Sequence, residues 1–462
     1  MLVNYKFKDG TESLSSHTGL SLVGALLERT DLKGRLSAVE LLRCQKPMIS
    51  HSDMVFTIVG LQCIGKPDYD AIEPFREDPF FIQSLGLDQC PSSSALRQRL
   101  DVVGNAFDSI IKEESAGLIR STAPEIRAVS TSGGLMVPLD LDVSPFDNSK
   151  TSKEGVSRTY KGHDGYAPIF AYLGRDGYLV NLEFREGKQH CQKGTVEFLM
   201  ESIKYAKKVT DEAMLVRLDS GNDCLDNIRV CIEEGVVWII KRNLRKESKS
   251  EWLKIAKDIG EKTNPRIGKR VWRGETYRDV EGFEKPLRIV FEVTERTIDK
   301  KGQVLLIPDI EVDAYWASLE ASCNEVIRLY HEHGESEQFH SELKSDMDLE
   351  RLPSGNFETN ALVLLLGMLS YNLLRLCGQE SLREDNGNAA INPTHRRKAS
   401  RRRIRTVMQD FICLASRLIY HSREWFLSFG KYCTCADLFK SIYKRFRLPI
   451  EKGPPRMVPV VQ

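Results

Sequence analysis

The chain lacks cysteines at metal-binding spacing. Its 11 cysteines are scattered over 462 residues, and the nearest two, Cys433 and Cys435, have a single residue between them. Structural zinc sites use cysteines and histidines at short fixed spacings such as Cys-x2-Cys, so this pattern gives no zinc finger. An odd count without close pairs also gives no disulfide framework. We expect reduced thiols and a cytoplasmic protein.

Three further signals are missing. The phosphate-binding loop Gly-x4-Gly-Lys-Ser/Thr of ATP-driven enzymes does not occur. The opening residues, MLVNYKFKDGTES, do not have the basic-then-apolar pattern of a signal peptide. The longest apolar stretch, 361–376, is shorter than the roughly 20 residues of a bilayer span, and Asn372 and Arg375 interrupt it. We predict that this stretch is a buried core helix and expect no membrane partner.

The chain also lacks an excess of either charge, because 66 Lys and Arg balance 65 Asp and Glu. Basic residues are nevertheless clustered locally. Residues 241–273 hold twelve Lys or Arg against four Asp or Glu, and residues 396–405, RRKASRRRIR, hold seven against none. We predict that the second run, with Arg401, Arg402 and Arg403, binds DNA phosphates in a salt-dependent way. The alternative is a solvated linker.

Hydrophobic periodicity predicts a mixed α/β fold. Strand-like segments at 135–143, 167–173 and 178–184 precede a helical pattern at 193–209, and strands and helices then alternate as far as residue 242. The expected regions are a helical 1–130, a first core part 131–242, a β-rich basic insertion 243–310, a last core part 311–383, and a basic linker with C-terminal helices 384–462.

Acidic residues stand where two predicted strands end. Asp140 and Asp142 are two positions apart in LDLDVS, so they face the same side of one strand. Asp219 closes the strand AMLVRLD. Sites in α/β sheets form where strands end and helices begin. Asp140 is either a further ligand or a residue that orients Asp142. Arg217 shares the face of Asp219, so Arg217 could pair with a catalytic acid.

A polar stripe follows in the helical pattern after residue 323. At about 100° per residue, Glu337 lies roughly 20° from Tyr330, and Lys344 lies roughly 20° further on. His333 falls within about 60° of Tyr330. A helix that only buries itself would carry leucine or isoleucine there, so a functional site explains the stripe better. Three acids, Asp142, Asp219 and Glu337, would suit two Mg²⁺ ions, with Mn²⁺ as a substitute.

These segments resemble the DDE transposases of bacterial insertion sequences, in the group marked by Tyr-x2-Arg-x3-Glu-x6-Lys. The chain reads Tyr330-x2-His333-x3-Glu337-x6-Lys344, with histidine in place of the family's arginine. LDLDVS and VRLDSG resemble the first and second aspartate motifs. The resemblance spans roughly residues 85–430 and implies a ribonuclease-H-like catalytic core with a β insertion between the second aspartate and the glutamate.

The resemblance further implies a function. It points to cut-and-paste transposition, in which Asp142, Asp219 and Glu337 hold the metal ions and cut and rejoin double-stranded DNA at terminal inverted repeats and target sites. It assigns Tyr330, His333 and Lys344 to contacts with the DNA end. It also implies recognition of the repeats by the N-terminal region and a homodimer that brings two ends together.

Two more residues in or beside the basic insertion are candidates for DNA contact. Arg242 ends a predicted strand, and Trp272 lies among basic residues in KRVWRGETY, where it would stack on an unpaired base. A core tryptophan is an equally good interpretation. Two rival functions also remain: a catalytically inactive or domesticated DNA-binding protein that occupies the element ends, and a ribonuclease-H-like nuclease that cuts without joining.

Overall fold

The first third of the chain is helical. The structure, a computed structural model, describes residues 3–41, 47–123, 125–383, 386, 399–449 and 454–459. After the short strand β1 (Leu14–Ser15), the helices are α1 (Leu20–Leu27), α2 (Leu32–Ser37), α3 (His51–Cys63), α4 (Pro79–Ser84), α5 (Ser93–Val103) and α6 (Asp108–Thr122). Ser92 caps α5 by accepting a hydrogen bond from the Ala95 amide, as its position before an apolar pattern predicts.

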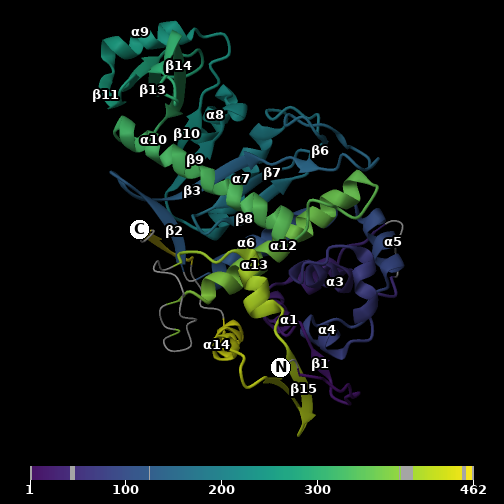
Figure 1. The fold of residues 1–462 in the computed structure, drawn as a ribbon. Coiled ribbons are helices and arrows are strands. Elements are labelled where there is room, and N and C mark those ends of the chain that lie inside the picture. Colours follow the sequence, from purple (N-terminus) through teal and green to yellow (C-terminus); the bar gives the residue numbers. More distant parts are fainter. Residues whose placement is uncertain are drawn as a thin grey trace.

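A mixed sheet forms the centre of the molecule (Figure 1). Its central strands are β3 (Gly134–Val143), β7 (Ile169–Leu173), β8 (Tyr178–Glu183), β9 (Met214–Leu218) and β10 (Val237–Lys241). They lie in the order β8-β7-β3-β9-β10. The pairs β8/β7 and β7/β3 are antiparallel, whereas β3/β9 and β9/β10 are parallel. The parallel strands are connected through α7 (Thr195–Val209) and α8 (Leu225–Glu233). The predicted mixed α/β class is confirmed.

Both edges of this core carry additional strands. On one side β2 (Glu125–Thr131) forms a hairpin with the start of β3, and β17 (Arg456–Pro459) pairs with β2 in parallel. A small sheet of β4 (Phe146–Asp147), β5 (Ser157–Arg158) and β6 (Asp164–Tyr166) follows β3.

The basic region after β10 extends the same sheet. It contains α9 (Lys249–Ile259), β11 (Glu261–Arg266), β12 (Lys269–Arg278), β13 (Leu287–Ile298) and β14 (Val304–Ala317). Because β14 pairs with both β13 and β10, the four strands continue the central sheet instead of forming a detached unit. Figure 1 shows these strands at one end of the molecule and β15 at the other. β14 runs past residue 310, since Ala314, Tyr315 and Trp316 continue into the buried core.

The polar stripe lies on a helical run whose winding changes. It consists of α10 (Cys323–His331), a 3₁₀ turn (Glu332–Glu335), α11 (Ser336–Ser341) and a π-helical turn (Glu342–Asp346). The prediction of one regular helix that aligns four polar side chains is therefore wrong. A tightened turn and then a widened turn shift the phase between Tyr330, Glu337 and Lys344.

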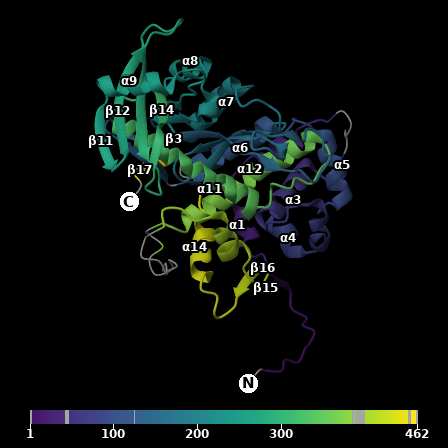
Figure 2. The ribbon, with the colours of Figure 1, turned by 45° about the horizontal axis from the view of Figure 1, so that its top comes forward.

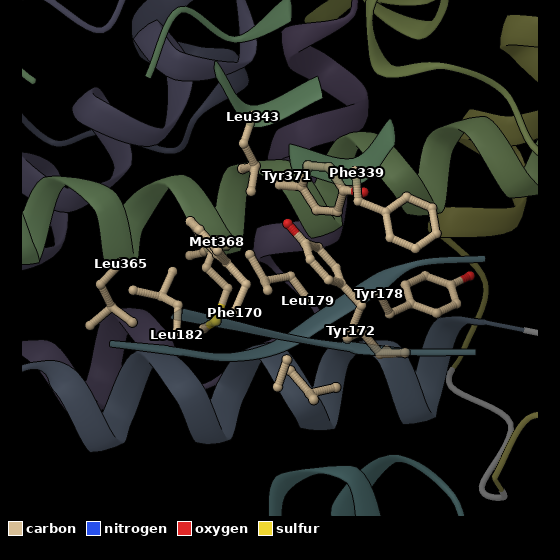
Figure 3. Packing of buried hydrophobic residues seen from close by; sticks show 14 of the residues in the cluster. Phe170, Tyr172, Tyr178, Leu179, Leu182, Phe339, Leu343, Leu365, Met368 and Tyr371 are labelled. Atoms are coloured by element: carbon tan, nitrogen blue, oxygen red, sulfur yellow. The ribbon is translucent and has the colours of Figure 1, made fainter. Parts of the chain in front are cut away.

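The long helix α12 (Phe357–Glu380) is the core helix predicted from residues 361–376. It is long and apolar enough to cross a membrane, but 94% of its most apolar window is buried inside the protein. Figure 3 shows Met368 and Tyr371 packed beside Phe339 and Leu343 of the polar run and above Tyr172 of β7. The rings of Tyr172 and Phe339 lie 5.0 Å apart. The helical run is thus held against the sheet by aromatic packing.

The C-terminal region is only partly helical. It contains α13 (Ile404–Val407), a second π-helical turn (Met408–Ile412), β15 (Ser416–His421), β16 (Glu424–Phe429) and α14 (Ala436–Phe446). The prediction of helices throughout 404–446 is wrong for the hairpin. Ser422 and Arg423 both adopt positive φ, 53° and 65°, which closes a two-residue turn. β15 also pairs with β1 near the N-terminus, and Figure 2 shows α14 near α1.

Candidate active site

Asp142 and Asp219 lie at the same edge of the sheet. In the parallel pair β3/β9, Asp140 is opposite Arg217 and Leu141 is opposite Leu218. One further step along both chains brings Asp142 opposite Asp219, on strands about 4.8 Å apart. Burial and then the charge of Asp142 raise the pKa of Asp219, so the two carboxylates interact electrostatically. The structure therefore brings together the two predicted strand acids.

Asp142 is also contacted from α11. Its Oδ2 lies 3.1 Å from Nε2 of His340 and accepts a hydrogen bond from Oγ of Ser336 at 3.3 Å. Burial alone would raise the pKa of Asp142, but His340, His333 and the Val143 backbone together outweigh burial, and the pKa is lowered. Sequence reasoning missed His340. Its signal was available, because a histidine three positions after Glu337 lies on the same side of a helix.

Glu337 lies on α11 and is exposed to solvent. The phenol of Tyr160, which donates a hydrogen bond to the Val143 carbonyl at 3.2 Å, lies within electrostatic range of Glu337 and of the other two acids. Burial raises the pKa of Tyr160 to about 12, and the charges of Asp142, Asp219 and Glu337 all contribute. All three predicted acids therefore act electrostatically on the same phenol.

The three acids do not yet form a closed metal cage. In the described part of the chain, no three His, Cys, Asp or Glu side chains gather closely enough to hold an ion. Asp142 and Asp219 are neighbours, and Glu337 stands apart at the solvent side. The donor chemistry nevertheless fits a hard divalent cation, because all three side chains are carboxylates. Burial first and the charge of Asp142 second raise the pKa of Asp219, and His333 and Asn222 do not offset them.

Tyr330 and Lys344 lie on either side of this edge. The ring of Tyr330 packs on Tyr315 at 4.7 Å, and its pKa is raised by burial and by the charges of Asp219 and Asp142. Lys344 donates to the Pro145 carbonyl and stands 5.2 Å above the ring of Phe146. Burial lowers the pKa of Lys344 to about 8. Both side chains are therefore near the acids, although the helical run does not align them on one stripe.

His333 points inward instead of toward solvent. Its side chain is 8% exposed, and Nδ1 lies 3.2 Å from Oδ1 of Asp140 without hydrogen-bond alignment. Burial alone would lower the pKa of His333, but the Asp140 carboxylate outweighs it and the pKa is raised. The predicted contact of His333 with DNA is not available in this conformation, because the 3₁₀ turn directs the imidazole at a buried carboxylate.

The sequence suggested that Arg217 could pair with a catalytic acid, but it pairs with Asp140 instead. The two side chains are 1% and 4% exposed and lie 2.6 Å apart. Asp140 is thus already neutralised by a guanidinium. Of the two roles considered for Asp140, the structure favours the residue that orients its neighbour over a further metal ligand.

Arg242 and Trp272 are both buried. Arg242 pairs with Glu247 at 2.7 Å and stacks on Trp316 at 4.5 Å, so its charge is used within the protein. Trp272 is 4% exposed and lies between Lys257 and Lys262. A ring without a free face cannot stack on a base, so that interpretation is wrong for this conformation. Trp272 is instead a core tryptophan, which was the alternative interpretation.

The described part of the C-terminal basic run also pairs with acids of the protein itself. Arg401 contacts Glu342 at 2.5 Å, and Arg403 contacts Asp346 at 2.7 Å. Arg402 contacts Asp410 at 3.0 Å. Residues 396–398 of the run lie outside the described residues. Arg401 and Arg403 therefore hold the basic run against the π-helical turn through ion pairs. A run of like charges does not predict this role.

The comparisons with known proteins assign the class. The chain belongs to the family described as Transposase DDE domain group 1, which matches residues 3–449. It is therefore a DDE-family transposase chain.

A solved structure that it resembles is the piggyBac transposase synaptic complex with hairpin DNA, determined by cryo-EM. That chain is 8% identical, with a TM-score of 0.37, and the match covers 85% of this chain and 78% of the other. No curated protein matches.

Proposed function

We propose that this protein catalyses cut-and-paste transposition of an insertion sequence, by metal-dependent phosphodiester hydrolysis and strand transfer at the element ends. One observation carries the proposal: in a chain of the DDE family, Asp142 and Asp219 stand opposite each other at one sheet edge, with Glu337 on the helical run beside them. The run β8-β7-β3-β9-β10 is the part that we assign to a ribonuclease-H-like core.

The proposed metal ligands are Asp142, Asp219 and Glu337. Carboxylate oxygens suit two Mg²⁺ ions, and Mn²⁺ would take their place. Bound magnesium would stabilise charge on the attacking and leaving oxygens of phosphoryl transfer. Asp219 supports this assignment, because its described partner is the amide of Asn222, 2.7 Å away, and no ion pair with a cation is found for it within the described chain.

The surrounding side chains would hold the DNA end. Lys344 has an ammonium near Asp142 whose pKa of about 8 keeps it mostly charged at neutral pH, so it is suited to a phosphate oxygen. Tyr330 and Tyr160 supply phenolic hydroxyls beside the same carboxylates. Because the donors and charges sit on packed elements, they would fix the orientation of the scissile phosphate before reaction.

The implied partners follow from this chemistry. The substrate is double-stranded DNA, with terminal inverted repeats recognised by the N-terminal helices and a target site joined afterwards. Two element ends must be held in one complex, so we propose a homodimer on DNA, in the bacterial cytoplasm.

One observation favours a different function. The described His, Cys, Asp and Glu side chains do not gather in threes at metal-binding distance, which suits a catalytically inactive protein that only occupies the element ends. Family membership and the presence of all three carboxylates favour the enzyme, since a decayed copy has no need to retain them.

A DNA assay separates the candidates. The protein is mixed with Mg²⁺ and labelled duplex carrying the inverted repeats that flank its coding sequence, together with target DNA. The proposal predicts nicks at the repeat ends followed by joined products. Binding without nicks would identify the inactive protein, and nicks without joining would identify a nuclease.

A further inference from the structure

One buried guanidinium contacts two of the elements around the site. Nε and Nη2 of Arg217 each donate to a different oxygen of Asp140 at 2.6 Å, and Nη1 donates to the Leu329 carbonyl at 2.6 Å. Both side chains are almost completely buried. Arg217 itself lies on β9, Asp140 on β3 and Leu329 on α10, so three elements meet at this side chain.

Each of these elements also carries one of the proposed catalytic acids or leads directly to it. Asp140 is two residues before Asp142, and Arg217 is two residues before Asp219. Side chains two apart on a strand share a face, so the Arg217–Asp140 pair lies next to the two acids on the same side of the sheet. Leu329 belongs to the helical run that continues to Glu337.

His333 adds a second contact from the same run. Its Nδ1 lies 3.2 Å from Oδ1 of Asp140, the oxygen that also accepts from Nε of Arg217. The helical run therefore meets the strand pair through a carbonyl on one side and an imidazole on the other. Packing of Phe339 on Tyr172 of β7 holds the later part of this run against the sheet, whereas the Arg217 group holds its α10 part there.

We propose that Arg217 is a positioning residue, whose fixed contacts with Asp140 and the Leu329 carbonyl set where Glu337 stands relative to Asp142 and Asp219. This inference rests on the proposed function. A flat guanidinium with donors in a fixed fork can satisfy a carboxylate in two places and a carbonyl in a third. An apolar pair would fill the same volume with comparable stability, but it would not fix the orientation of the helical run relative to the strand pair.

Arg217→Lys is the sharpest test, because lysine keeps the charge and loses the fork. Residues that orient metal ligands typically change metal affinity or activity about 10- to 100-fold. We expect the variant to fold and bind DNA normally, to bind Mn²⁺ about 10-fold or more weakly by titration calorimetry without DNA, and to cleave correspondingly slowly. The matched control is Arg127→Lys. Arg127 forms an ion pair with the buried Asp176, and β2 pairs with the start of β3, far from Asp142.

The ratio of cleavage rates in Mn²⁺ and Mg²⁺ distinguishes positioning from a purely structural role. Mg²⁺ demands near-ideal octahedral geometry, so misplaced ligands should slow the Mg²⁺ reaction more and raise this ratio. Partial unfolding would lower both rates equally. The double variant Asp140→Leu with Arg217→Met, which removes both buried charges, should melt near the wild-type temperature and still show the raised ratio.

Three results would overturn the inference. If Arg217→Lys binds Mn²⁺ as tightly as wild type and has an unchanged ratio of Mn²⁺ to Mg²⁺ cleavage rates, the inference is wrong and the proposed function stays intact. Equal losses in both metals, in proportion to the unfolded fraction, would assign Arg217 to stability alone. A wild-type chain that neither binds Mn²⁺ nor cuts DNA would overturn the proposed function, and this inference with it.

Discussion

Two groups of buried or half-buried acids in this protein differ in how their charges are compensated. In the π-helical turn, Glu342 is 1% exposed and pairs with Arg375 and Arg401. Asp346 is fully buried and pairs with Arg403 and Arg405. At the sheet edge, Asp142 contacts the imidazole of His340 and the hydroxyl of Ser336, and Asp219 accepts from the amide of Asn222.

The difference separates structural acids from functional ones. A carboxylate buried with arginines has its charge compensated inside the protein, and breaking the pair leaves an uncompensated charge. Two carboxylates buried side by side without a full cation repel each other and favour binding of a metal ion. Perturbed pKa values of this kind gather at functional sites, and Asp219 is the example here.

The largest effect is expected on catalysis when a site acid is removed. Asp219→Ala should lower DNA cleavage by more than about 100-fold, because residues that only orient ligands already cost 10- to 100-fold. DNA affinity, measured by fluorescence anisotropy, should stay close to wild type. Asp226→Ala, which removes an exposed acid paired with Arg229, is the control and should cleave normally. Normal cleavage by Asp219→Ala would remove Asp219 from the site.

A large effect on stability is expected in the other group. Glu342→Gln leaves the fully buried Arg375 facing a neutral amide, and breaking a buried pair costs about 3–5 kcal/mol of unfolding free energy. Urea titration measures this loss. The control Asp437→Asn, in an exposed pair with Lys440, should change little. If the two variants unfolded alike, the π-turn acids would not be structural.

In metal-free protein the charge of Asp219 should lower stability, whereas the charges of the π-turn acids raise it. The folded-state pKa of Asp219 is raised, so the folded protein binds more protons there than the unfolded chain, and stability falls as pH rises above the ordinary value of 3.8. Asp219→Asn removes this repulsion. In EDTA its unfolding free energy should exceed that of wild type, by an amount that grows as the pH rises from 3.8 through the raised folded-state pKa of Asp219. A destabilised variant would contradict the comparison.

A pH-dependent effect on stability is also expected at Lys344. Its pKa is lowered by burial to about 8, against 10.5 in the unfolded chain, so the unfolded chain binds more protons between these values. The wild type should therefore gain stability relative to Lys344→Met as pH rises from about 8. Thermal melting across this range measures the gain. A difference in stability between wild type and Lys344→Met that stays constant with pH would show that burial does not disfavour the charged ammonium.

The strand acids were predictable because they depend on local pattern. Asp142 and Asp219 follow apolar segments whose period gives strands, and the Tyr-Glu-Lys spacing located Glu337. The inward turn of His333 was not predictable, because it depends on a 3₁₀ turn and on Asp140, almost two hundred positions earlier. The pairing of Arg401 with Glu342 likewise joins distant segments, which periodicity does not encode.

The prediction for the segment that forms the β15–β16 hairpin was wrong for a different reason. Its residues, SRLIYHSREWFLSF, have an apolar content that fits a helix as well as a strand. What decides between them is the turn at Ser422–Arg423 and pairing with β1, some four hundred positions away. Short apolar segments of this kind take their structure from tertiary context more than from propensity.

The central claim is that Asp142, Asp219 and Glu337 share divalent ions, and one measurement tests it most directly. Crystals of the protein with its DNA ends are soaked in Mn²⁺, and anomalous scattering locates the ions. The account predicts Mn²⁺ at the sheet edge with oxygens of all three carboxylates as ligands. An ion-free edge at saturating Mn²⁺, or Mn²⁺ held there with Glu337 remaining outside its coordination sphere, would contradict it.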